Sequence, residues 1–121
     1  MKRGDVITMS TRGVAAKPRP GIVIHADHLI RADRPLLVCP LTSDIVGAPL
    51  LRVDIEPSIA NGLRVPSQVM LDRLSSVLPR EIGIVIGEVE DEDILRIDLG
   101  LTNILGLGRV VATGLRLGTS S

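Results

Sequence analysis

The chain contains no phenylalanine, tyrosine or tryptophan, although 45% of its 121 residues are hydrophobic. Its core must therefore be built from Ile, Val, Leu and Met, and the β-branched members of this set favour strands. A chain of this length forms one domain with a single modest core. The missing aromatics also remove the usual surface for stacking unpaired bases, so nucleic-acid binding would depend on charge, hydrogen bonds and aliphatic contacts.

Short aliphatic runs bounded by Gly, Pro and charged residues predict several strands. We expect strands over residues 6–9, 19–25, 36–41, 51–56 and 67–74, the last running on towards 77–78. The run at 22–24 does not alternate with polar residues, so both of its faces should be buried, and residues 84–86 are expected to form a further buried strand. Asn61 and Gly62 mark a tight turn, and residues 79–83 a single helical turn with Pro first.

Acidic residues 90–93 precede apolar residues at helical spacing up to residue 105. Acids stabilise the first turn of a helix, so this run is interpreted as a helix start rather than a metal site. Gly100 weakens the helix, and Gly106 and Gly108 end it. Residues 1–108 are expected to form the domain and residues 109–121 a tail of uncertain order. The fold predicted is mainly β (α+β), a strongly bent sheet or partly closed barrel with a terminal helix.

The 14 basic and 14 acidic residues cancel, and the net charge is zero. Residues 1–40 are net basic and residues 41–100 net acidic, but charge alone does not establish nucleic-acid binding. The chain shows neither a signal peptide nor a membrane span, so we expect a soluble, cytoplasmic protein. Cys39 is the only cysteine; it lies in an apolar run and is interpreted as a buried small hydrophobe.

The most informative polar residues stand at the ends of two expected strands. Arg19 lies between two prolines at the start of one strand, and Thr42 and Ser43 follow the next. A guanidinium presents a planar fork of donors that suits a phosphate. The alternatives are that Arg19 pairs with a surface carboxylate and that the two hydroxyl residues cap a turn.

Several segments together resemble the MazF/PemK family of toxins from toxin–antitoxin pairs. The matching pieces are KRGDVI at 2–7, RPGIVI at 19–24, VCPLTS at 38–43, SQVMLD at 67–72 and the closing helix around 99–107. They occur in the family's order and cover roughly residues 1–107.

The resemblance implies an SH3-like barrel of about five to seven strands with a C-terminal helix, usually a homodimer. It also implies an endoribonuclease (mRNA interferase) that cuts single-stranded RNA without a metal or other cofactor, by attack of the ribose 2′-OH. The partner it implies is an antitoxin with an acidic, hydrophobic, disordered tail that folds on binding. The family's active-site Arg and Thr correspond to Arg19 and Thr42, with Ser43 adjacent.

No general base is evident by analogy, since Gln68 and Met70 stand where some PemK-type members carry Arg and Asp. His25 is a further catalytic candidate because histidine side chains can exchange protons near neutral pH, although a histidine at a strand end is also often simply hydrogen-bonded. Candidates for RNA contacts are Arg12, Lys17, Arg31, Gln68 and Arg73.

Two other functions share this fold class. A non-enzymatic gyrase poison like CcdB is the alternative, but the terminal GTSS segment lacks the Trp-containing element associated with that activity. The lack of an evident general base is also compatible with a domain that has no catalytic activity and serves only to bind a partner.

Overall fold

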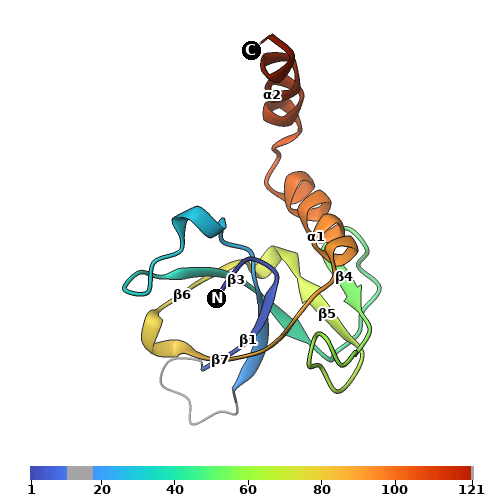
Figure 1. The fold of residues 1–121 in the computed structure, drawn as a ribbon. Helices are drawn as coiled ribbons and strands as arrows, with labels where there is room; N and C mark the ends of the chain where they lie inside the picture. Colours follow the sequence, from blue (N-terminus) through green and yellow to red (C-terminus); the bar gives the residue numbers. More distant parts are fainter. Residues whose placement is uncertain (11–17, 121) are drawn as a thin grey trace.

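The computed structural model describes residues 1–10 and 18–120. Within these ranges the chain forms a bent sheet with two α-helices following it (Figure 1). The strands are β1 (Asp5–Met9), β2 (Arg19–Val23), β3 (Leu36–Thr42), β4 (Arg52–Ile55), β5 (Ser67–Met70), β6 (Ser75–Val77) and β7 (Ile82–Glu88). Single 3-10 turns are η1 (Asp27–Leu29), η2 (Leu71–Arg73) and η3 (Pro79–Glu81), and the helices are α1 (Asp91–Ile104) and α2 (Gly108–Ser120). The predicted mainly β fold with a closing helix is confirmed.

β3 is the strand around which the sheet bends. The strand order is β4-β5-β3-β2-β1-β7, with β6 also paired to β3, and all these pairs are antiparallel. One edge of β3 pairs with β2. Its other edge pairs with β6 near its start and with β5 at its end. The sheet therefore curls into a partly closed barrel.

Successive residues of the central strands point into two different cores. Val6 and Ile22 belong to the cluster beneath α1, whereas their neighbours Ile7 and Val23 belong to a second cluster inside the barrel. All four side chains are fully buried. The prediction that both faces of this aliphatic run are buried is confirmed for Ile22 and Val23.

α1 begins and ends where the sequence pattern predicts. Three acids occupy its first turn, and Gly106 follows it with a φ of 68°, a left-handed conformation that favours glycine. Ile97 and Leu101 are buried against the sheet. Arg3 ties this helix to the barrel, since its guanidinium pairs with the Asp98 carboxylate and donates to the Ile24 carbonyl oxygen at 2.9 Å. No helix in the described ranges is long and apolar enough to cross a bilayer.

Two details of the strand prediction are wrong. The expected strand over 67–74 stops at Met70, where η2 intervenes before β6. The strand around 84–86 exists as β7, but it is not buried, because Ile84 is 67% and Val85 47% exposed. β7 stands at the end of the strand order, paired with β1, and the loop around residues 60–62 lies against it, where the Glu88 N–H donates to the Ala60 carbonyl oxygen at 2.9 Å. The segment 109–121, predicted as a tail, is helical in its backbone as α2 up to Ser120.

Candidate functional site

Arg19 stands where β2 begins, and its neighbours determine its backbone. A residue before proline is restricted to extended conformations, so Pro20 holds Arg19 in the strand. Arg19 pairs with Met9 of β1, and two residues later Gly21 pairs with Pro40 of β3. Continuing the β2–β3 register by two residues brings Arg19 opposite Thr42.

Arg19, Thr42 and Ser43 line one open hollow of about 710 Å³ at these strand ends. Leu41 and the loop that precedes β5 form other parts of its wall. The structure thus brings together the three residues that the sequence singled out.

Thr42 performs the turn role considered above and still has a hydrogen to donate. Its Oγ1 accepts the backbone N–H of Asp44 at 3.1 Å. A hydroxyl that accepts one bond can also donate one, and Thr42 is only partly buried. Capping the turn therefore orients the hydroxyl and is compatible with a contact to a ligand in the hollow.

Arg64 also lines this hollow, and sequence reasoning missed it. Hydrogen bonds hold the loop that precedes Arg64: buried Asn61 accepts the N–H groups of Ser58 and Leu63 through Oδ1, each at 3.0 Å. Gly62 has a φ of 71°, and a Cβ there would lie 2.2 Å from the Ile86 carbonyl oxygen. The glycine lets the loop lie directly on β7. The Asn-Gly turn was visible in the sequence, but the strand end that it reaches was not.

A second hollow, of about 530 Å³, adjoins the first, and Arg19 and Leu41 line both. η2 contributes Arg73 to it, so one of the predicted RNA-contacting residues shares a hollow with Arg19. Met9 and Met70 are among its apolar lining residues.

The three arginines of these hollows have no carboxylate partner in the described ranges. The ion pairs found there involve Lys2, Arg3 and Arg96. Residues 11–17 contain no acid in the sequence that could supply one. The alternative that Arg19 serves a surface ion pair is therefore not supported, and the guanidinium groups are available to an anion.

Gln68 is not at the surface where we predicted an RNA contact. It is 4% exposed, and its amide nitrogen donates to the Val46 carbonyl oxygen at 2.9 Å and to Asp54 Oδ1 at 2.8 Å. Its oxygen accepts the Val46 N–H at 3.1 Å. Gln68 pairs with Thr42 in the sheet, so it fixes the loop that follows Thr42 rather than reaching a ligand.

His25 and Arg31 lie at the opposite end of the β2–β3 pair. Six residues of extended chain separate His25 from Arg19, about 20 Å at roughly 3.3 Å per residue. His25 Nδ1 accepts the Leu37 N–H at 3.1 Å, which is the hydrogen-bonded alternative considered above. Arg31 donates to the carbonyl oxygens of its own loop. Arg12 and Lys17 fall outside the described residues.

Cys39 is fully buried, as predicted. Burial raises the pKa of its thiol to about 11. The thiol is therefore protonated at neutral pH and is a packing group, since the thiolate is the nucleophilic form.

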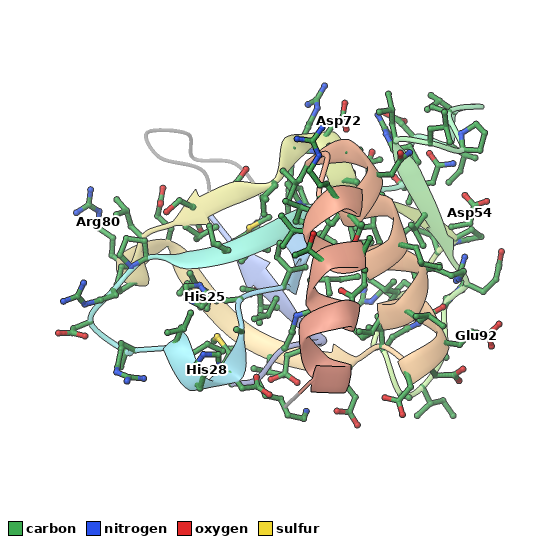
Figure 2. The ribbon with its side chains drawn as sticks, turned by 90° about the horizontal axis from the view of Figure 1, so that it is seen from above. His25, His28, Asp54, Asp72, Arg80 and Glu92 are labelled. Atoms are coloured by element: carbon green, nitrogen blue, oxygen red, sulfur yellow. The ribbon has the colours of Figure 1, made fainter. Side chains whose placement is uncertain are left out.

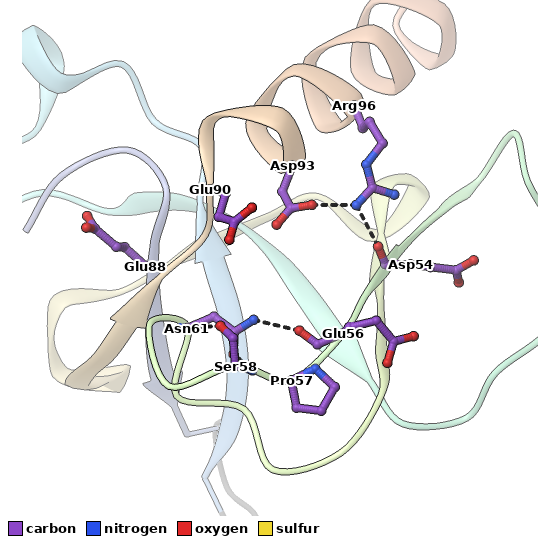
Figure 3. Close-up of a pocket in the computed structure, with 9 residues that line it drawn as sticks. All are labelled: Asp54, Glu56, Pro57, Ser58, Asn61, Glu88, Glu90, Asp93 and Arg96. Carbon is purple, nitrogen blue, oxygen red and sulfur yellow. Dashed lines mark hydrogen bonds and ion pairs between the residues drawn. The ribbon is translucent and has the colours of Figure 1, made fainter.

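A third hollow, at the base of α1, has the opposite charge. Arg96 spans it, donating to the Asp93 carboxylate and, at 2.9 Å, to the Asp54 carbonyl oxygen (Figure 3). Its acidic lining residues are Asp54, Glu56, Glu88, Glu90 and Asp93. Such a surface repels phosphate. No group of three or more His, Cys, Asp or Glu side chains within 1–10 and 18–120 could hold a metal ion.

Comparison with known proteins agrees with the geometry. The family described as PemK-like, MazF-like toxin of type II toxin-antitoxin system matches residues 2–105. The chain belongs to this family. It is 36% identical over 108 residues to a Mycolicibacterium smegmatis protein named probable endoribonuclease MazF, covering 88% of this chain and 98% of that one.

Solved structures of the same fold include an endoribonuclease in complex with its cognate antitoxin from a mycobacterial species. Its TM-score is 0.73 at 21% identity, covering 88% of this chain and 96% of that one. The Mycobacterium tuberculosis toxin MazF-mt6 has a TM-score of 0.71 at 19% identity, covering 84% and 96%. These likenesses show the barrel fold.

Proposed function

We propose that this chain is the toxin of a toxin–antitoxin pair and cleaves single-stranded RNA without a metal ion. The observation that carries the proposal is the hollow shared by Arg19, Thr42 and Ser43. The M. smegmatis relative, named a probable endoribonuclease, supports an activity on RNA.

In this reaction the ribose 2′ oxygen attacks the adjacent phosphorus and the P–O5′ bond breaks. The products are a 2′,3′-cyclic phosphate and a 5′-OH end; the 2′ proton is taken up by a base, and O5′ gains a proton. Arg19 stabilises the additional negative charge on the phosphoryl oxygens, and Thr42 and Ser43 donate hydrogen bonds to them. Arg19 is not the base, because the pKa of a guanidinium lies above about 12. Asp44 is the carboxylate among the described residues of this hollow and is the candidate to accept the 2′ proton.

The direct test is incubation of the purified chain with a long RNA in EDTA. Wild type should cut at defined sites, and Arg19→Ala should lower kcat about 10²- to 10³-fold, the effect of removing one group that stabilises a transition-state charge. Arg80→Ala is the matched control. Arg80 is an exposed arginine of η3 (Figure 2), and it lines neither of the two hollows that Arg19 lines. Equal cleavage by wild type and Arg19→Ala would reject the proposal.

We further propose that the antitoxin inhibits by covering these hollows. The antitoxin complex of the mycobacterial endoribonuclease supports a protein partner of this kind. An acidic, partly apolar tail would place carboxylates against Arg19 and Arg64 and exclude RNA. A synthetic acidic peptide of the cognate antitoxin should compete with RNA for the wild type and lose affinity for Arg64→Ala.

A homodimer is proposed as the functional assembly. β7 is the last strand of the sheet order and exposes the Ile84 and Val85 side chains, and an apolar edge strand is a ready surface for another chain. Light scattering should give a dimer mass that Ile84→Lys shifts to the monomer. The CcdB-like alternative is tested by a gyrase supercoiling assay, in which we expect no inhibition.

A further inference from the structure

The second hollow, which Arg19 also lines, has both apolar and polar lining residues. Its volume of about 530 Å³ falls within the range of roughly 300–1,000 Å³ that is typical of sites for small organic groups. Met9, Leu41 and Met70 are among its apolar lining residues. Methionine thioethers adapt their shape and contact the edges of flat rings favourably. They can therefore hold a nucleobase in a chain that has no aromatic residue to stack on it.

Glu81 lines this hollow and is held in place by several hydrogen bonds. Its Oε1 accepts the Leu78 N–H at 2.9 Å, which caps η3. Its backbone N–H donates to the Leu78 carbonyl oxygen, and its own carbonyl oxygen accepts the Ser10 N–H, each at 2.8 Å. Oε2, the second carboxylate oxygen, has no hydrogen-bond partner among the residues that the structure describes. It is thus a positioned acceptor without a partner.

We propose that this hollow binds the base next to the cleaved phosphate and that Glu81 selects a base carrying an exocyclic amino group. The inference rests on the proposed ribonuclease function, because Arg19 lines both hollows and links the base to the phosphate. An ionised carboxylate only accepts hydrogen bonds. Cytosine, adenine and guanine each offer an amino group to it, whereas uracil presents carbonyl oxygens there, and these repel the carboxylate. Arg73, which lines the same hollow, can donate to a ring acceptor of the bound base.

Glu81→Gln tests this selection with little change to the fold. The Gln oxygen can still accept the Leu78 N–H, so the η3 cap is kept, while the atom in place of Oε2 becomes an amide donor. The variant should therefore favour a base that presents a carbonyl oxygen at this place, such as uracil. The control is Glu92→Gln, the same chemical change at an exposed residue in the first turn of α1 (Figure 2).

The measurement is cleavage of an RNA library randomised at the two positions that flank the cut, read by sequencing. For wild type, an amino-bearing base at one of these positions should be cut about tenfold faster than uracil, as expected for one hydrogen bond to a charged group. Glu81→Gln should abolish or reverse this ratio, and Glu92→Gln should keep it.

Two other outcomes of the library experiment would count against the inference. Wild-type cleavage that tolerates uracil equally at both positions overturns it whatever the variant does, and so does an unchanged ratio in Glu81→Gln. If wild type cleaves no RNA, the proposed function fails as well, so the two failures are distinguishable.

Discussion

Gly100 lies in the middle of α1, and replacing it with alanine produces two effects on stability that are similar in size and opposite in sign. Alanine is favoured over glycine inside a helix by about 1 kcal/mol. A Cβ at this position, however, would lie 2.3 Å from Leu71 Cδ1, and Leu71 is 2% exposed. The methyl group cannot enter unless the Leu71 side chain moves within a packed core.

The magnitudes predict which effect is larger. Forcing an additional methyl group into a well-packed core costs about 1–3 kcal/mol. Subtracting the helix gain leaves a net destabilisation of about 1 kcal/mol for Gly100→Ala. Leu71 opens η2, which also carries Arg73, so displacement of Leu71 should also weaken RNA binding at the second hollow.

Urea unfolding followed by circular dichroism measures this balance. In a double-mutant cycle, Leu71→Ala should cost less in the Gly100→Ala background than in wild type, because the new methyl group fills part of the cavity. Gly114→Ala in α2 is the matched control, since its Cβ would meet nothing within 4 Å, and no loss of stability is expected. A gain of about 1 kcal/mol in Gly100→Ala would refute the argument, because it would mean that helix propensity alone decides.

Three further predictions concern single side chains. Burial raises the pKa of Cys39 to about 11 in the folded state, whereas an unfolded thiol has a pKa of about 8.5. The contribution of the protonated thiol to the free energy of unfolding is therefore fully present below the unfolded pKa and is lost as the pH rises through the folded pKa. Cys39→Ala should lack this alkaline loss in urea titrations at rising pH. Arg64→Ala should reduce the slope of log affinity for single-stranded RNA against log salt by about 0.7, the share of one phosphate contact, and Arg80→Ala should leave the slope unchanged. Thr42→Val should lower kcat about 10²-fold by removing a donor, while Thr42→Ser, which keeps the hydroxyl, should retain most activity in the same RNA cleavage assay.

The strands and the Arg19–Thr42 pair could be predicted because local features determine them. Prolines and aliphatic runs place strand ends at these two residues, and adjacent antiparallel strands bring such ends together. The catalytic role assigned to them remains a proposal.

Other features depend on packing that one sequence does not display. Arg64 reaches the hollow only because Gly62 lets its loop lie on β7. Gly100 was interpreted as a weak point of the helix, whereas it is the position at which α1 approaches Leu71. The aliphatic run of β7 was predicted to be buried, but burial depends on the place of a strand in the sheet. His25 was a candidate because histidine is a common proton-transfer residue, yet β2 runs away from Arg19, so His25 lies beyond the far end of this strand.

The central claim is that the ribose 2′-OH is the nucleophile at the Arg19–Thr42 hollow. The most direct measurement uses an RNA oligonucleotide that the toxin cuts at one site, with a single deoxynucleotide placed on the 5′ side of that cut. In EDTA, we predict that the all-RNA strand yields a cyclic phosphate end by mass spectrometry and that the substituted strand stays intact at this site. Cleavage of the substituted strand at a comparable rate would contradict the account, because no 2′ oxygen would be present to attack.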